Sequence, residues 1–204
     1  MVETWVNLSP TSGSGNGTVK VFAKEHTGRI NRTSTITFKS DVAGVTETRE
    51  VIQRGSSEYV RFLQENYSIA ASDEYIILEG ESNASKLLFV GLGFILPLET
   101  MYEVAGEKIT SGTEIPGDPG KCEKYNFKIK IQLGKNTDAA EKTYTIQVMS
   151  TEGNTHSTTI KHSAADAFFT VDPESIYPSG SITLESNGLE KTIAIKSNTS
   201  WRVF

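Results

Sequence analysis

The chain has 204 residues, a formal net charge of −5 at pH 7 and a single cysteine, Cys122. Its 20 Lys and Arg residues are interspersed with acidic residues, so no basic stripe exists to neutralise phosphates, and nucleic acid is excluded as an expected partner. One cysteine can neither close an internal disulfide nor build a zinc cluster, and we expect no cofactor and no metal. The longest apolar run, 87–96, is broken by glycines and is much shorter than the roughly 20 residues of a membrane helix, so no membrane insertion is expected.

The first stretch of the chain alternates apolar and polar residues. Val19 and Val21 alternate with Lys20 and Phe22, and Ile36 lies in a similar run. Such alternation is typical of half-buried antiparallel strands. The segments between these runs are rich in Gly, Asn, Ser and Pro, which predicts turns.

The middle and last stretches repeat this pattern. The segment "YNFKIKIQL" places Phe127, Ile129 and Ile131 on one face, and further strands are predicted around 75–81, 86–94, 142–150 and 155–163. The last stretch contributes only "FFTVDP", "GSITLESNGLEKTIAIKS" and "SWRVF". No helical periodicity occurs, so the predicted fold class is all-β, with two immunoglobulin-like β-sandwich domains.

Two internal repeats divide the chain into these domains. "RTSTITFKSDVAGVTETREVIQRGSS" and "KTYTIQVMSTEGNTHSTTIKHSAA" read as the same closing hairpin, whereas "EYIILEGESNASKLLFVG" and "SITLESNGLEKTIAIKS" read as the same opening hairpin. Residues 62–165 therefore hold a complete copy. Residues 1–57 hold only a closing half, and residues 168–204 hold only an opening half.

Several short motifs in the two outer segments resemble one family. "SNTSWRV" contains Trp201, and Trp5 is followed by "VNLSPTSGSGNGTVKV", "RTSTITF" and a strand that ends in "VIQRG". Once the two chain ends are joined, seven residues separate the two tryptophans. In this order the motifs resemble the BACON family (Bacteroidetes-associated carbohydrate-binding, often N-terminal) of immunoglobulin-like sandwiches. The resemblance of 66–164 is weaker, because that copy has neither tryptophan and a different long loop.

The resemblance implies a sandwich of about seven strands in each copy, without catalytic activity. It also implies a spacer or binding module in extracellular proteins of gut bacteria and of the phages that infect them. The expected location is therefore the cell surface, the extracellular space or a virion.

The outer segments need each other, because an unpaired half-sandwich exposes backbone donors, acceptors and apolar residues. Two arrangements remain open. Segments 1–57 and 168–204 could form one discontinuous domain within a chain, which a high effective concentration favours. Alternatively, copies could join head to tail by strand complementation.

Few residues are candidates for a site. An aromatic ring can stack on a sugar, so Trp5, Tyr102 and Tyr125 are assigned to a candidate carbohydrate platform, with a core position as the alternative for Trp5. Trp201 is assigned to the structural core between the two sheets. The histidines, among them His162, are expected to be solvated residues at strand ends, and no catalytic residue is assigned.

Two functions follow from these observations. The first is a non-catalytic structural or interaction module, such as a spacer, a surface assembly element or a capsid or tail decoration protein, with other protein subunits as partners. The alternative is a carbohydrate-binding module of a bacterial polysaccharide-utilisation protein, with a polysaccharide as its ligand. An enzyme is not expected.

Overall fold

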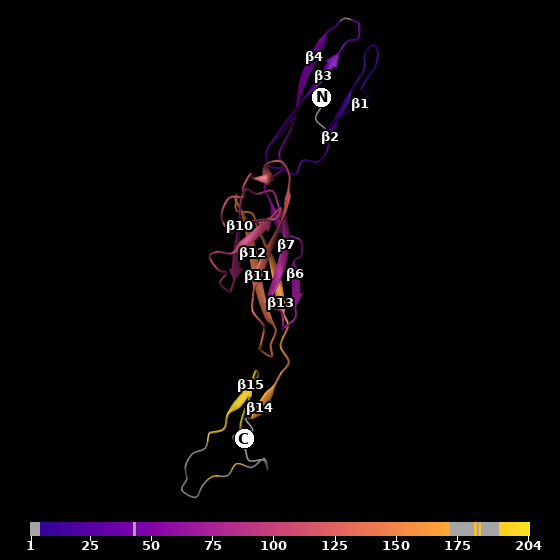
Figure 1. Ribbon diagram of the computed structural model, residues 1–204. Coiled ribbons are helices and arrows are strands. Elements are labelled where there is room, and N and C mark those ends of the chain that lie inside the picture. Colours follow the sequence, from indigo (N-terminus) through magenta and orange to yellow (C-terminus); the bar gives the residue numbers. More distant parts are fainter. Residues whose placement is uncertain (1–4, 43, 172–181, 183, 185–191) are drawn as a thin grey trace.

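The computed structural model describes residues 5–42, 44–171, 182, 184 and 192–204, and in this part of the chain its regular elements are β-strands and one short 3-10 turn, η1 (Pro119–Lys121). The expected all-β immunoglobulin-like fold class is confirmed. The chain is elongated, with a central sandwich between an N-terminal and a C-terminal part (Figure 1). No helix in the described ranges has the length and apolar character needed to cross a bilayer.

The central sandwich consists of two sheets. The five-stranded sheet has the order β10 (Glu107–Thr110), β9 (Met101–Val104), β11 (Tyr125–Gln132), β7 (Tyr75–Ser82) and β5 (Val60–Phe62). The four-stranded sheet has the order β6 (Asn66–Ile69), β13 (Thr155–His162), β12 (Lys142–Ser150) and β8 (Leu87–Leu92). All neighbouring strands named here are antiparallel except β6 and β13, which are parallel.

Alternation in β11 creates one wall of the core. Phe127, Ile129 and Ile131 are at most 1% exposed, whereas the residues between them are exposed. In the register of the sheet, Ile129 lies opposite Leu78 of β7. The inward face predicted for this strand is therefore correct.

An aromatic cluster fills the space between the two sheets. The ring of Phe127 lies 5.9 Å from that of Phe62 and 5.6 Å from that of Phe89, both nearly edge to face. The ring of Tyr102 lies 5.2 Å from that of Phe89. Edge-to-face packing of this kind adds to the stabilisation from burial of apolar area, so the central sandwich has its own core.

The N-terminal part consists of two hairpins that form separate two-stranded sheets. β1 (Val6–Ser9) pairs with β2 (Lys20–Ala23), and β3 (Arg32–Lys39) pairs with β4 (Thr46–Gln53). Val6 and Ile36 are the buried apolar residues of this part, while every residue of β2 is exposed. This part therefore has much less core than the central sandwich.

The C-terminal part has one described pair of strands, β14 (Phe169–Val171) and β15 (Ile195–Ser197), which are antiparallel. Trp201 is 51% exposed instead of buried between sheets, so its assignment to the core is wrong for the isolated chain. The physical reason is that the described C-terminal strands have no second sheet opposite them.

Within the described ranges, the two outer segments do not form a discontinuous domain in one chain. Figure 1 shows β1–β4 at one end of the molecule and β14–β15 at the other, and in the described ranges no strand of one part pairs with a strand of the other. The reason is the route of the chain. The chain enters the central sandwich at β5 and leaves it after β13 at the opposite end (Figure 1), so the sandwich separates the two segments.

The aromatic core gives a direct test of what stabilises the central sandwich. Phe127→Ala is expected to lower the free energy of unfolding by about 3–5 kcal/mol, because a fully buried ring leaves a cavity. Asn126→Ala, at the exposed neighbouring position of β11, is expected to change it by less than about 0.5 kcal/mol. Urea unfolding followed by far-ultraviolet circular dichroism measures both, and equal effects would contradict the assigned core.

Candidate functional site at the junctions between modules

The described polar contacts are concentrated where the N-terminal part meets the central sandwich. Asn83, at the end of β7, is fully buried. Its Nδ2 donates to the carbonyl oxygens of Thr27 (3.0 Å) and Ser57 (3.1 Å), and its Oδ1 accepts from the backbone N–H of Tyr59 (2.9 Å). One side chain therefore satisfies backbone groups from a loop of the N-terminal part and from the linker into β5.

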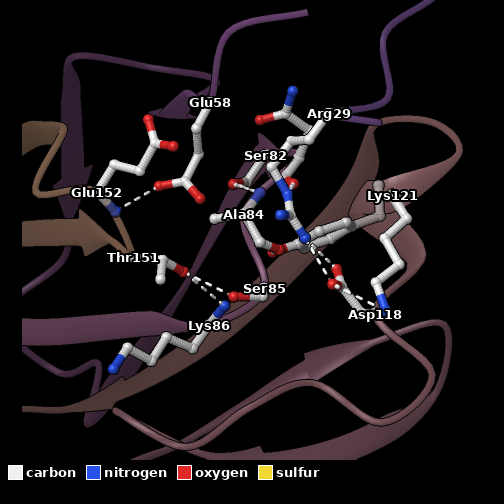
Figure 2. Close-up of polar contacts among 12 residues, drawn as sticks. Arg29, Glu58, Ser82, Ala84, Ser85, Lys86, Asp118, Lys121, Thr151 and Glu152 are labelled. Atoms are coloured by element: carbon white, nitrogen blue, oxygen red, sulfur yellow. Dashed lines mark hydrogen bonds and ion pairs between the residues drawn. The ribbon is translucent and has the colours of Figure 1, made fainter. Parts of the chain in front are cut away.

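An arginine strengthens the same junction. The Arg29 guanidinium donates to both carboxylate oxygens of Asp118, 2.6 Å from Oδ2, and to the carbonyl oxygen of Asn83. Figure 2 shows Arg29 directed at Asp118, with Lys121 beside the carboxylate. The hydrogen bond to Asp118 is the main reason why the pKa of Arg29 is raised above its ordinary value. One guanidinium nitrogen, Nη2, donates to both carboxylate oxygens, and Nε donates to the Asn83 carbonyl, so the arginine connects Asp118 to the end of β7.

Backbone hydrogen bonds run alongside this ion pair. The N–H of Arg29 donates to the carbonyl of Gly120 (2.9 Å), and the N–H of Ile30 donates to that of Lys121 (3.2 Å). A Cβ atom on Gly28 would overlap the backbone of Lys121 and Cys122, so this approach requires glycine. Asp118 itself has a φ of 44°, in the left-handed region that Asp tolerates better than most residues.

A second set of contacts fixes the linker that enters β5. Glu58 is buried, and its Oε1 accepts from the N–H of Glu152 (2.7 Å). Nearby, the Thr151 hydroxyl accepts from the N–H of Lys86 (3.2 Å) and shares a hydrogen bond with Ser85 (2.9 Å). In Figure 2 these groups lie across from Arg29, so the end of the central sandwich is held on both sides of the linker.

Glu81 links three strands at the rim of the junction. Its carboxylate accepts from Lys124 Nζ (2.8 Å) and from Arg61 Nε (2.8 Å). The hydrogen bond from Lys124 is the largest cause of a pKa lowered below the ordinary 4.5. Burial opposes it, and the hydrogen bond from Arg61 adds to the lowering. The ionised form of Glu81 is therefore the stabilising one.

The same asparagine contact recurs at the other end of the central sandwich. Asn198 directly follows β15, as Asn83 directly follows β7. Its Oδ1 accepts from the N–H of Phe168 (2.9 Å), and its Nδ2 donates to the carbonyls of Thr137 (3.1 Å) and Asp166 (2.9 Å). The donors and acceptors match those of Asn83 one for one.

The residues around the two asparagines repeat as well. The Ser82 hydroxyl donates to the carbonyl of Tyr59 (2.7 Å), and the Ser197 hydroxyl donates to that of Phe168 (3.1 Å). Both serines directly precede the asparagines. Each asparagine N–H also points to the same carbonyl as its serine, at 3.4 Å in both cases.

A backbone hydrogen bond between loop and linker also occurs at both junctions. The N–H of Ser56 donates to the carbonyl of Gly28 (2.8 Å), and the N–H of Ala165 donates to that of Asp138 (2.8 Å). The two junctions differ in the ion pair: Ala139 follows Asp138 where Arg29 follows Gly28, and Asp138 pairs with Lys142 (2.8 Å). The structure thus contains the same connection between modules twice.

The repeat predicted from the sequence pairs "ESNASK" with "ESNG" at 185–188, which lies outside the described residues. In the structure the contacts of Asn83 recur at Asn198 in "KSNTS". Ser-Asn occurs at 82–83, 186–187 and 197–198, so the dipeptide alone could not decide between the last two. Arg29 and Asp118 are far apart in the sequence and carried no signal.

The candidate carbohydrate platform is not assembled. Tyr102 is 2% exposed and Tyr125 is 8% exposed, so neither offers a ring face to a sugar, and their assignment is wrong. Burial raises the pKa of Tyr102 to about 12, and the Tyr125 hydroxyl donates to the carbonyl of Ala84 (2.8 Å). The histidine expectation also fails for His162, which is fully buried.

Trp5 lies far from these tyrosines, in the N-terminal part. It is half-buried, and the Arg32 guanidinium carbon lies 4.5 Å from its ring centroid. Tyr75, an exposed tyrosine of β7, has Lys130 Nζ 3.8 Å from its ring centroid. One face of each ring is therefore occupied by a cation. In the described ranges, no group of three or more His, Cys, Asp or Glu residues is placed to bind a metal.

Comparisons with known proteins add little to this description. Neither a protein-family model nor a curated protein sequence matches the chain. Among solved structures, the extracellular cadherin domains 1–4 of protocadherin gamma B7 are similar at 12% identity and a TM-score of 0.39. That match covers 84% of this chain and 43% of the cadherin chain, so this chain spans less than half of that structure.

Asn83→Ala tests the junction contact. The amide of Tyr59 loses its acceptor, and its hydrogen exchange is expected to accelerate by about tenfold, while the amide of Phe168 is unchanged. Asn198→Ala is the reciprocal control and is expected to accelerate Phe168 alone. Hydrogen exchange measured by mass spectrometry resolves both, and exchange that rises at neither amide would contradict the assigned contacts.

The lowered pKa of Glu81 makes the junction sensitive to acid. Its contribution to stability is fully present above the unfolded-state pKa of about 4.5 and is lost as the pH falls through the lower folded-state value. Glu81→Gln is expected to flatten the loss of stability in this acidic range. Unfolding measured at several pH values, with the exposed Glu107→Gln as control, checks the slope; an unchanged slope would rule out the assigned role.

Proposed function

We propose that this protein is a non-catalytic structural module of BACON-like immunoglobulin-like sandwiches, which acts as a spacer or assembly element in an extracellular, cell-surface or virion setting. The observation that carries the proposal is the repeated junction. A flexible linker would need no repeated set of contacts. Here the same side-chain and backbone hydrogen bonds connect each module to the next.

The junction has the properties that a spacer requires. Its contacts come from loops and from a strand end, so they orient neighbouring modules without use of the sheet faces. At the N-terminal junction, the Arg29–Asp118 pair has side chains that are 20% and 17% exposed, which shields the pair from water. A partly buried, charge-assisted pair stabilises the junction more than an exposed ion pair would.

The carbohydrate-binding alternative now depends on Trp5 alone among its three assigned residues. The Arg32 side chain on its ring leaves at most one face for a sugar. Calorimetric titration with plant and host polysaccharides would promote this alternative if it gave saturable binding that Trp5→Ala abolished. If the protein is a structural module, the titration should give no saturable heat of binding.

The structural proposal makes a prediction about rigidity. Spin labels at Thr48 and Lys161, two exposed positions in the N-terminal part and the central sandwich, are placed in a Cys122→Ser background because Cys122 is free and exposed. Pulsed electron resonance in dilute protein is expected to give one narrow distance distribution. Arg29→Ala is expected to broaden it, because the ion pair and the contact to Asn83 are lost.

A control variant shows whether the broadening is specific to the Arg29 contacts or follows the loss of any arginine. Arg49→Ala removes an arginine whose ion pair with Glu47 is exposed, so it is expected to leave the distribution narrow. A broad distribution in the unaltered protein would overturn the spacer proposal, whatever the variants do.

A further inference from the structure

We propose that the N-terminal part of one copy completes the C-terminal part of a second copy, so that chains associate head to tail through a shared sandwich. This inference rests on the proposed structural function and names its partner, a second copy of this chain. It is argued from the strands present, their open edges and the exposed apolar residues.

The two terminal parts contain complementary strands. The hairpin β3–β4 leads to the Ser56–Gly28 bond as β12–β13 leads to the Ala165–Asp138 bond, so it has the place of β12–β13. β14 follows its junction as β5 does, and β15 precedes Asn198 as β7 precedes Asn83. Each part thus supplies strands that the other does not have among its described residues.

The open edges are complementary too. In the complete sandwich, β11 lies between β9 and β7, and β12 lies between β13 and β8. β2 precedes the loop of Thr27 as β11 precedes the loop of Thr137, and β3 has the place of β12. Within the described ranges, β2 pairs only with β1 and β3 pairs only with β4. Among the same residues β15 pairs only with β14, whereas β7 pairs with both β5 and β11. Edge strands with unpaired backbone groups are templates for strand addition.

Apolar side chains that would be core residues are exposed in the N-terminal part. Val19 is 40% exposed and Val21 is 47% exposed, although Ile129 and Ile131 at the corresponding positions of β11 are 0% and 1% exposed. This exposure ends when a second sheet and a neighbouring strand cover the residues.

The C-terminal part shows the same deficiency. Ile193, immediately before β15, is 36% exposed, while Leu78 at the corresponding position of β7 is fully buried. Trp201, three residues after Asn198, is 51% exposed, while Lys86, three residues after Asn83, is half-buried just before β8. Asn198 itself is half-buried, whereas Asn83, in the complete sandwich, is fully buried. Association buries these groups together.

The partner is a second copy because each copy carries both complementary parts, and one copy cannot bring its own two parts together. The central sandwich holds the two parts at opposite ends (Figure 1), and both junctions are fixed by hydrogen bonds. Every copy presents both surfaces, so each contact leaves one of each free. Such a heterologous contact extends into a linear assembly instead of a closed dimer.

The register of β11 and β7 gives a cross-linking test. Ile129 lies opposite Leu78, so Val19 of one copy should lie opposite Ile193 of the next. In a Cys122→Ser background, a chain with both Val19→Cys and Ile193→Cys is expected to form a ladder of disulfide-linked multimers under mild oxidation. The control, Lys20→Cys with Ile193→Cys, places the first thiol on the other face of β2 and is expected to form no disulfide-linked multimers.

Sedimentation velocity over a range of concentrations tests association without cysteines. The unaltered chain is expected to form concentration-dependent oligomers. Val21→Asp places a charge in the core that two copies would share, and it is expected to weaken association by more than about tenfold. The control, Phe22→Asp, lies on the outward face of the same strand and is expected to leave association unchanged.

The outcomes distinguish this inference from the proposed function. A monomer at all concentrations, or a disulfide formed only within a chain, would overturn head-to-tail association. The narrow distance distribution in dilute protein would still support the spacer. Oligomers that Val21→Asp does not weaken would also overturn the inference, since another surface would then be responsible.

Discussion

The connection between modules depends on an asparagine side chain that satisfies three backbone groups at once. Asn83 accepts one hydrogen bond and donates two, and these partners lie in the preceding module, in the linker and at the start of the next strand. Buried backbone groups without partners are costly, and no flexible linker could bury them in this way. The approach of Gly28 to the loop at Lys121 and the ion pair of Arg29 depend on the geometry that this contact sets.

The three parts of the chain differ in how much of their stability is their own. The central sandwich encloses an aromatic cluster and fully buried Leu and Ile residues between two sheets. The terminal parts have hairpins whose apolar residues remain largely exposed. The buried core of the described residues therefore lies mostly in the central sandwich, and the terminal parts contribute little to it.

The sequence predicts the fold better than it predicts the site, for physical reasons. Alternation at Phe127, Ile129 and Ile131 reports a face directly, because strand geometry has a period of two. Tyr125 lies two residues before Phe127, so the same alternation places it on the inward face of β11, contrary to its assignment to a platform. For Tyr102 the sequence does not show whether the ring faces the core or a ligand. Burial of a ring with its hydroxyl satisfied, as in Tyr125, depends on a carbonyl that is distant in the chain.

The junction was beyond sequence analysis for a related reason. Its groups come from loops with little periodicity, and most of its bonds use backbone atoms, which every residue has. Of the two arrangements that the sequence leaves open for the first and last segments, closure within one chain is not formed in the described residues. The positions at which the chain enters and leaves the central sandwich, at opposite ends, were not visible in the repeat.

The repetition of one junction has a geometric consequence. Two modules joined by the same bonds are related by one rotation and one translation, and the repeated use of a single such operation always traces a screw axis. The small set of atoms around Asn83 and Asn198 therefore determines the pitch and the handedness of any longer array. A change of a few degrees at that point would be multiplied along its length, while the sheet faces could diverge in sequence with little effect on its overall form.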